Sequence, residues 1–258
     1  MNPTVSKLLT ITVFISISTM GNLFSDEEGK IKWSYTGDTG PEAWGQIAKE
    51  YELCGVGKVQ SPVDIATKEA VYRKFSTIKF YYQPLPIDII NTGHTIKVKS
   101  DKKSYIDVGG KIFRLHEFHF HLPSEHTING KYYPMDVHFV HKSDDGEFAV
   151  LGVFFEQGNN AHPELEKIFN AMPEERGRKV KQEGILVDIS KFFPANDTFY
   201  FYDGSFTMPP CSEVVEWYVF EKPISISKDQ IEQFRKLYPG NSRPTQPLHQ
   251  RSVYKNKP

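Results

Sequence analysis

The chain has 258 residues, and its 31 lysines and arginines nearly balance 32 aspartates and glutamates, which leaves a formal net charge of −1. This balance gives no electrostatic reason to expect nucleic acid or an anionic membrane as the main partner. A hydrophobic fraction of 39% and a charged fraction of 24% exclude disorder for the bulk of the chain. The length is sufficient for one large domain with a substantial core.

The N-terminus carries an uncharged apolar run from Leu8 to Met20, preceded by Lys7. This run is too short to span a hydrocarbon core, which needs about 20 residues. A short positive region, a short apolar core and small residues beyond it are typical of a secretory signal. We predict a signal peptide over residues 1–21, cleaved between positions 21 and 25, and an exported protein, periplasmic or secreted, without a stable membrane span. A buried N-terminal strand is the alternative, but no turn signal joins the run to a fold.

Cys54 and Cys211 are the only two cysteines. An even count in an exported chain favours a disulfide, whereas two unrelated buried thiols would be the default in the cytosol. A bridge over so long a loop would constrain the unfolded chain by roughly 5 kcal/mol.

Segments rich in β-branched and aromatic residues predict strands, separated by prolines and glycines. The predicted strands cover residues 78–82, 94–99, 112–121, 135–141, 148–155, 198–202 and 214–220. Pro163 opens a predicted helix over 164–172, and Ser227 with Gln230 forms a capping box before a second one. We therefore expect a single, mainly β domain over residues 30–256, with a large, mostly antiparallel sheet and a few surface helices.

The histidines are concentrated in one part of the chain. Six of the nine lie between positions 116 and 141, where uniform spacing would place about one. They are His116, His119, His121, His126, His138 and His141. This concentration indicates a site.

Residues two apart in a strand face the same side, so His119 and His121 project together while Phe118 and Phe120 point to the opposite layer. Two imidazoles on one face can bind one ion with metal–nitrogen bonds of about 2.0–2.1 Å. A third ligand must come from a neighbouring strand.

The turn signal Asn129-Gly130 predicts a hairpin that returns His138 or His141 beside the first pair. His138 and His141 are three residues apart, so their side chains point to opposite faces of the strand. Only one of them can lie on the same face as His119 and His121, and the spacing does not decide which. Three neutral imidazoles without a thiolate leave a fourth metal position for water, as in catalytic rather than structural sites.

Other motifs fit poorly. The zincin motif H-E-x-x-H is absent, because Phe120 stands where its second histidine belongs, and no P-loop, G-x-G-x-x-G or G-x-S-x-G occurs. The spacing of His119, His121 and Glu125 resembles the first half of a cupin metal site. The second half is missing, since Lys142 occupies the position where a cupin would have asparagine.

From about Trp33 to Val253 the chain resembles the alpha class of carbonic anhydrases. The motifs that carry the resemblance are Gly40-Pro41-Glu42-x-Trp44, Gln60-Ser61-Pro62-Val63-Asp64-Ile65, Asn91-x-Gly93-His94, Phe118-His119-Phe120-His121, Ser124-Glu125-His126-Thr127, His138-Phe139-Val140-His141, Gly204-Ser205-Phe206-Thr207-Met208-Pro209-Pro210, Trp217 and Arg243-Pro244-x-Gln246-Pro247-Leu248. So many motifs in one order make chance implausible.

The resemblance implies that Zn²⁺ is the cofactor and that His119, His121 and His138 are its ligands, which leaves His126 and His141 structural. It implies a twisted, carbonic-anhydrase-like sheet of about ten strands with the zinc at the bottom of a cone. It also places a disulfide between Cys54 and Cys211, as in exported members. The pattern specifies no oligomeric state.

The implied reaction is the reversible hydration of CO2 to bicarbonate and a proton by zinc-bound hydroxide. The resemblance places Thr207 and Glu125 where they orient the hydroxide, and His94 where it carries the proton to buffer, with Tyr35 holding the connecting waters. The unperturbed pKa of histidine, near 6.5, suits a group that carries this proton to buffer, whereas the alternative for His94 is an ordinary solvated histidine at a loop or strand start. The implied substrate pocket consists of Val140, Val150, Phe206, Met208 and Trp217.

The chain departs from common family residues at several positions around this site. Met208 replaces a frequent Thr, Phe206 a frequent Leu, and Thr92 and Lys97 replace amides along the proton path. We expect altered proton transfer and inhibitor fit. Glu117 stands where Gln is common and Asp136 where Glu is common, and carboxylates bonded to ligand imidazoles raise ligand basicity.

The family also contains non-catalytic binding modules, which are the alternative function. Such modules typically lack one or more ligand histidines. This chain contains all three histidines together with Thr207 and Glu125. Their presence favours an active enzyme, a zinc lyase acting on CO2 and bicarbonate, over a binding module.

Overall fold

The structure is a computed structural model that describes residues 32–257, so the predicted signal peptide lies outside the described residues. The helices are η1 (Gly37–Thr39), α1 (Trp44–Ile47), η2 (Lys49–Tyr51), α2 (Leu53–Val56), α3 (Pro163–Phe169), η3 (Ile189–Phe192) and α4 (Lys228–Leu237). Within residues 32–257, no helix is both long and apolar enough to cross a membrane.

Strands make up most of the regular structure. They are β1 (Asp64–Ile65), β2 (Val71–Tyr72), β3 (Ile78–Tyr81), β4 (Leu85–Asn91), β5 (Ile96–Lys99), β6 (Tyr105–Val108), β7 (Lys111–His121), β8 (Thr127–Ile128), β9 (Lys131–Tyr132), β10 (Met135–Ser143), β11 (Phe148–Gly158), β12 (Lys179–Val187), β13 (Phe199–Gly204), β14 (Val215–Phe220), β15 (Ile224–Ser227) and β16 (Tyr254–Lys255).

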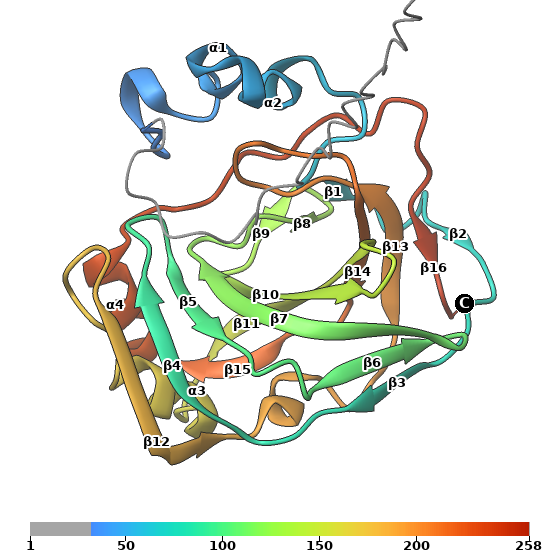
Figure 1. The fold of residues 1–258 in the computed structure, drawn as a ribbon. Helices are drawn as coiled ribbons and strands as arrows, with labels where there is room; N and C mark the ends of the chain where they lie inside the picture. Colours follow the sequence, from blue (N-terminus) through green and yellow to red (C-terminus); the bar gives the residue numbers. More distant parts are fainter. Residues whose placement is uncertain (1–31, 258) are drawn as a thin grey trace, which may run out of the picture. The chain divides into compact units, whose positions relative to one another are not determined.

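One 13-stranded sheet forms the frame of the fold (Figure 1). Its main path has the order β12-β4-β5-β7-β10-β11-β14-β13-β16-β2. Most neighbours are antiparallel, while β11 pairs in parallel with β14 and β15, and β16 with β2. The predicted fold class, mainly β with a large, mostly antiparallel central sheet, is confirmed.

Two long strands at one end of this path, β4 and β12, are missing from the predicted elements. In β4, Pro86 lacks the N–H group that a strand interior normally uses, and it pairs with Leu186 where the register between β4 and β12 shifts. Strand β12 is an edge strand whose residues are mostly exposed, so its apolar pattern is weak. Local propensity cannot recognise strands that depend on their neighbours in this way.

The Asn-Gly turn forms as expected, because Asn129 and Gly130 have φ values of 51° and 74°. The prediction that it joins the two histidine-bearing strands directly is wrong. The turn closes the short hairpin of β8 and β9, which forms a separate three-stranded sheet with β1. The two histidine strands, β7 and β10, nevertheless lie side by side and antiparallel.

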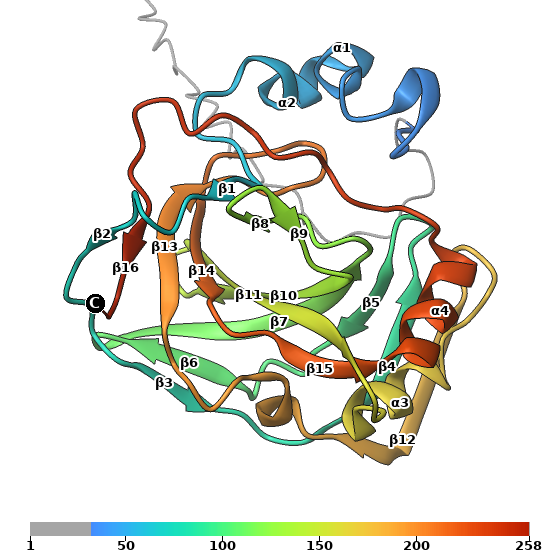
Figure 2. The ribbon, with the colours of Figure 1, turned by 180° about the vertical axis from the view of Figure 1, so that it is seen from behind.

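Both predicted helices are present. The Ser227 hydroxyl accepts from the Gln230 backbone in the capping box at the start of α4. Helix α3 begins at Pro163 and ends at Phe169, earlier than expected, and Asn170 forms its C-cap. Figures 1 and 2 show α3 and α4 beside the end of the sheet formed by β4 and β12.

The C-terminal segment after α4 crosses one end of the sheet on its way to β16 (Figure 2). It is held by buried hydrogen bonds. The Arg243 guanidinium donates to Gln60 Oε1, to the Ser61 carbonyl and to the Cys54 carbonyl, each at 2.8 Å. Cys54 and Cys211 form the predicted disulfide, in a small core with Trp33 and Trp44.

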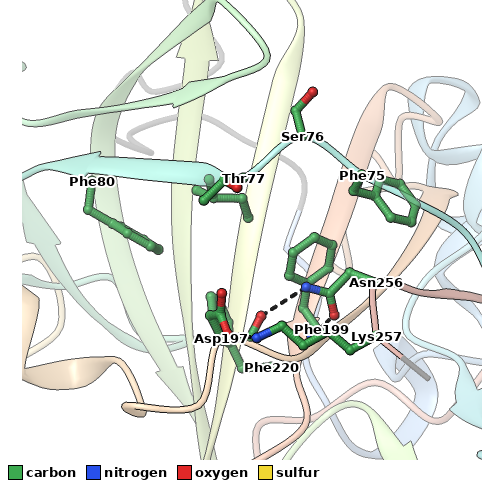
Figure 3. Close-up of a pocket in the computed structure, with 10 residues that line it drawn as sticks. Phe75, Ser76, Thr77, Phe80, Asp197, Phe199, Phe220, Asn256 and Lys257 are labelled. Carbon is green, nitrogen blue, oxygen red and sulfur yellow. Dashed lines mark hydrogen bonds and ion pairs between the residues drawn. The ribbon is translucent and has the colours of Figure 1, made fainter.

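A pocket of about 120 Å³ lies between the segment leading into β3 and the C-terminal residues (Figure 3). Four phenylalanines line it, namely Phe75, Phe80, Phe199 and Phe220. Its charged residues, Asp197 and Lys257, pair with each other, and Asn256 Nδ2 donates to the Asp197 carbonyl at 3.0 Å. None of the lining residues belongs to the histidine-rich region, so this pocket is separate from it.

Candidate metal centre

Strands β7 and β10 bring three histidines together on one face of the sheet. His119 and His138 are directly opposite each other in the antiparallel ladder, and His121 lies two residues along β7. One ring nitrogen from each of the three lies within 4.8 Å of the other two. All three side chains are buried. This group could hold a metal ion.

The pairing of β7 with β10 resolves the alternative that spacing left open. His141 points away from the group: its Nδ1 donates to the Phe139 carbonyl at 3.0 Å, and its Nε2 accepts from the Tyr82 hydroxyl at 2.8 Å. His126 bonds the Tyr202 hydroxyl through Nε2 at 2.6 Å. Both rings have partners within the fold.

Each clustered imidazole is held by a hydrogen bond through one nitrogen. His119 Nδ1 bonds both Glu117 carboxylate oxygens at 3.0 and 3.1 Å, and His121 Nδ1 bonds the Asn241 carbonyl at 2.7 Å. His138 Nε2 bonds Asp136 Oδ2 at 3.2 Å. These bonds fix the ring orientations and leave the second nitrogen of each ring directed to the shared centre.

Burial opposes protonation of two of the three imidazoles, those of His121 and His138. Burial lowers the pKa of His121 well below its usual value, and the neighbouring His138 and His119 lower it further. Burial and His119 likewise lower the pKa of His138. Burial opposes ionisation of Glu117, but His119 and Lys97 outweigh it and lower the pKa of this carboxyl. Neutral imidazoles have the free lone pairs that a metal ion requires.

An unsatisfied buried atom tests whether a metal fits here. His121 Nε2 is buried and has no hydrogen-bond partner, although most buried polar atoms have one. A divalent cation at the centre would satisfy this nitrogen together with those of His119 and His138. Three imidazoles without thiolate match a catalytic metal site with one open position. The residues therefore fit the ion that the family resemblance implies.

Glu125 borders the same centre. Its Oε1 accepts from the Arg243 backbone at 2.8 Å, while Oε2 is buried without a hydrogen-bond partner and lies 3.4 Å from His121 Nε2 and 3.7 Å from His138 Nδ1. Burial raises the pKa of this carboxyl well above its usual value, and Asp136 adds to the rise. The Thr207 side chain acts in the opposite direction, which places its hydroxyl beside Glu125.

The loop that carries Thr207 is anchored from two sides. Trp217 Nε1 donates to the Ser205 carbonyl at 3.0 Å, and the Ser205 backbone donates to Ser61 Oγ at 3.0 Å. Thr207 itself is buried. These bonds hold the start of the loop in place, two residues before the Thr207 hydroxyl.

An apolar surface adjoins the histidines on the same face of the sheet. Val140, Val150 and Trp217 are register partners across β10, β11 and β14. The Trp217 ring centroid lies 4.8 Å from that of His138. Phe206 packs against this cluster, whereas Met208, expected in the same pocket, packs with the disulfide and Trp33.

His94 differs from its expected state. It is only 7% exposed, and its ring stacks on Trp33 with centroids 3.7 Å apart. Burial and Arg176 lower its pKa to about 4, so the ring is neither solvated nor at the unperturbed pKa near 6.5 that suits a proton carrier. Tyr35 lies edge-on to this ring at 6.5 Å, and its buried hydroxyl has no hydrogen-bond partner.

Two residues that hold the centre were not among the predicted site residues. Asn241 offers its carbonyl to His121, and its side chain donates to the carbonyls of His94 and Phe120 at 3.0 and 2.9 Å. Arg243 holds Glu125 through its backbone. The Arg243-Pro244 motif was visible in the sequence, but only the fold shows that this segment lies next to the histidines.

Comparison with known proteins identifies the family. The family model described as eukaryotic-type carbonic anhydrase matches residues 39–257. A carbonic anhydrase from Nostoc sp. is 38% identical over 248 residues, covering 93% of this chain and 94% of that protein. A carbonic anhydrase from Neisseria gonorrhoeae is 40% identical, covering 86% of each.

A solved structure agrees with the sequence comparisons. The alpha-carbonic anhydrase from Thermovibrio ammonificans, in complex with the inhibitor sulfanilamide, is 47% identical and has a TM-score of 0.84. The match covers 88% of this chain and all of that one. With the fold, the three-histidine group and this similarity over most of its length, the chain belongs to the alpha-class carbonic anhydrases.

Proposed function

We propose that this carbonic anhydrase catalyses the reversible hydration of CO2 to bicarbonate and a proton, with Zn²⁺ bound by His119, His121 and His138. The observation that carries the proposal is the convergence of three buried imidazole nitrogens, one from each histidine, within 4.8 Å of one another. A non-catalytic binding module is disfavoured, because the ligand histidines, Glu125 and Thr207 are all present.

Zn²⁺ in a site of this kind acts as a Lewis acid that makes a nucleophile available from water at neutral pH. The chain's own residues prepare the site for the ion. Glu117, Asn241 and Asp136 hold the three rings in their orientation, so little reorganisation is needed when the ion binds.

We assign an orienting role to Glu125 and Thr207. The Arg243 backbone fixes the Glu125 carboxyl, and the Thr207 hydroxyl lies beside it. A hydroxyl that donates to this carboxyl has its own lone pairs free to accept a proton from a reacting water molecule. Such an arrangement holds the nucleophile in one orientation toward CO2.

The surface of Val140, Val150, Phe206 and Trp217 is the proposed substrate-binding wall. Val140, Val150 and Trp217 lie beside His138 on the same sheet face, and Phe206, from the loop after β13, packs against them. CO2 is small and without net charge, so an apolar surface can hold it near the centre and does not favour the anionic product. Met208 packs against the disulfide-containing core and is proposed as a neighbour of this wall.

His94 is the proposed proton carrier, accepting at its ring a proton produced by hydration. Tyr35, whose buried hydroxyl lacks a protein partner, is proposed to hold water on the way from the centre to His94. The lowered pKa of His94 makes it a weak acceptor at neutral pH in its Trp33-stacked position.

We also propose that the protein is exported after removal of residues 1–21. The disulfide between Cys54 and Cys211 supports an oxidising compartment, in which such bonds persist. N-terminal sequencing of the mature protein and fractionation of the cells are the tests. A mature protein that retains Met1 and stays in the cytoplasm would contradict this proposal.

The test of the main proposal is stopped-flow CO2 hydration by purified protein, before and after removal of the metal. We expect activity to disappear with a chelator and to return with stoichiometric Zn²⁺. The His116→Gln variant, which changes a histidine of β7 outside the cluster, is the matched control and should behave as the unmodified protein does. Full activity of the metal-depleted protein would contradict the proposal.

A further inference from the structure

The loop after α3, over residues 173–178, is bound tightly to the turn that carries His94. Asn91 Nδ2 donates to the carbonyls of Pro173 and Glu174 at 2.9 and 3.0 Å. The Gly177 backbone donates to the Asn91 carbonyl at 2.7 Å, and the Asn91 backbone donates to the Arg178 carbonyl at 3.1 Å. Asn91 donates three of these hydrogen bonds and accepts the fourth, and together they hold the loop beside the turn.

This attachment brings the Arg176 side chain onto the turn itself. A Cβ atom at Gly93 would lie 2.5 Å from both Cδ and Nε of Arg176, so the arginine side chain occupies the space next to the Gly93 backbone. Gly93 has a φ of +83°, which also favours glycine. Because Gly93 immediately precedes His94, Arg176 Nε lies against the turn that carries the proposed proton carrier.

The surroundings of His94 contain few other titratable groups. Its ring stacks on Trp33 and meets the edge of Tyr35, and its carbonyl accepts from Asn241 Nδ2. From the neighbouring elements, Tyr238 donates to Asn91 Oδ1 at 2.6 Å, and Glu175 is paired with Arg178 at 3.6 Å. Arg176 is the charged group that acts on the imidazole, adding to the effect of burial on its pKa.

We propose that Arg176 is a positioning residue for proton transfer: it keeps a positive charge next to His94 and so moves proton uptake by this imidazole to lower pH. The physical reason is that a cation disfavours a second cation nearby. The effect of this charge on catalysis depends on the proposed role of His94 as the proton carrier. Because a carrier works best when its pKa is near the operating pH, Arg176 slows transfer at neutral pH.

The direct test is an NMR titration of the His94 ring in the zinc-loaded protein, with the resonance assigned by its loss in His94→Gln. Removal of one nearby charge in Arg176→Gln should raise the midpoint by about one pH unit. For a wild-type pKa of about 4, this shift increases the protonated fraction at pH 5 about fivefold. Arg176→Lys, which keeps the charge, should titrate close to the wild type.

Arg178→Gln is the matched control, because it removes a positive charge from the same loop while the Arg178 side chain is 61% exposed and paired with Glu175. It should leave the His94 midpoint unchanged. An Arg176→Gln midpoint equal to that of the wild type, or an equal shift in Arg178→Gln, would overturn the inference.

Oxygen-18 exchange between CO2 and water separates proton transfer from CO2 hydration and provides the catalytic readout. In weak buffer at pH 7, Arg176→Gln should show proton transfer several-fold faster than the wild type, with kcat/KM unchanged. Excess imidazole buffer should remove the difference. A parallel loss of kcat and kcat/KM would indicate a structural defect and overturn the inference. If the wild type did not hydrate CO2, the proposed function would fail while the NMR shift still tested the effect of Arg176.

Discussion

The two faces of β7 and β10 are built from alternate residues of the same strands, yet they have opposite physical characters. One face carries Phe118, Phe120 and Phe139, which pack into the main apolar core. The other carries His119, His121 and His138. On the apolar face the side chains are close-packed, whereas the polar face contains buried atoms without partners, including His121 Nε2 and Glu125 Oε2.

Because of this difference, we expect the apolar face to contribute mainly to stability and the polar face mainly to metal binding and catalysis. An unsatisfied buried polar atom costs about 1–3 kcal/mol, so the buried polar groups of this face favour folding less than apolar side chains do and call for a bound partner. The apolar face offsets that cost through burial of large aromatic side chains. Substitutions on one face should therefore change the free energy of unfolding, and substitutions on the other should change metal binding and catalysis.

The largest expected effect is at the polar face, in His121→Ala. Loss of one ligand should leave the protein folded with substoichiometric zinc and reduce CO2 hydration by more than about 1000-fold, because the lowering of the pKa of water by the metal is lost. Metal analysis, circular dichroism and stopped-flow kinetics measure these quantities. A variant that retains one zinc per chain and full activity would remove His121 from the proposed ligand set.

Phe120→Ala tests the apolar face. Removal of this fully buried ring should lower the free energy of unfolding by about 3–5 kcal/mol, while the metal affinity of the molecules that remain folded changes little. Phe80→Ala is the control: Phe80 is 37% exposed, so its truncation should cost clearly less than that of the fully buried Phe120 ring. Urea unfolding checks both. Equal costs for the two variants would contradict the contrast between core and surface.

A histidine on the apolar side gives a pH-dependent effect of intermediate size. Burial lowers the pKa of His141 to about 3 in the folded protein, whereas the unfolded chain takes up this proton near pH 6.5. Unfolding therefore binds a proton between these values, and stability falls as the pH falls, by about 2 kcal/mol from pH 7 to pH 5. His141→Gln should lose this part of the pH dependence in urea titrations. An unchanged pH dependence in the variant would show that His141 does not contribute it.

The smallest effect expected is at Glu117, which bonds His119 on the polar face. A neutral amide in Glu117→Gln makes the His119 imidazole less basic, so a bound metal ion would be a stronger Lewis acid. The midpoint of the rise of kcat/KM with pH should therefore shift down by up to about one pH unit. Glu156→Gln, an exposed position on β11, should leave the profile in place. A profile that shifts upward or does not move in Glu117→Gln would contradict this explanation.

Much of the site could be predicted from local pattern. Alternation within one strand places His119 and His121 on the face opposite Phe118, because successive side chains of a strand point to opposite sides. The capping box of Ser227 and Gln230 could also be predicted from the sequence, because its two residues are only three positions apart. In these cases the interacting groups are close in sequence, and backbone geometry alone relates them.

Features that depend on distant residues required the tertiary structure. The choice of His138 over His141 rests on the register of β10 against β7, and the edge strand β12 is a strand because it pairs with β4. The pKa of His94 depends on burial under Trp33 and on Arg176, far away along the chain. The sequence by itself therefore determined which residues share a face and which family they indicate. Only the tertiary structure decided which faces of the strands lie against each other and which charges lie near each buried group. The reason is that both depend on contacts between residues far apart in the sequence, which the alternation of side chains within one strand does not determine.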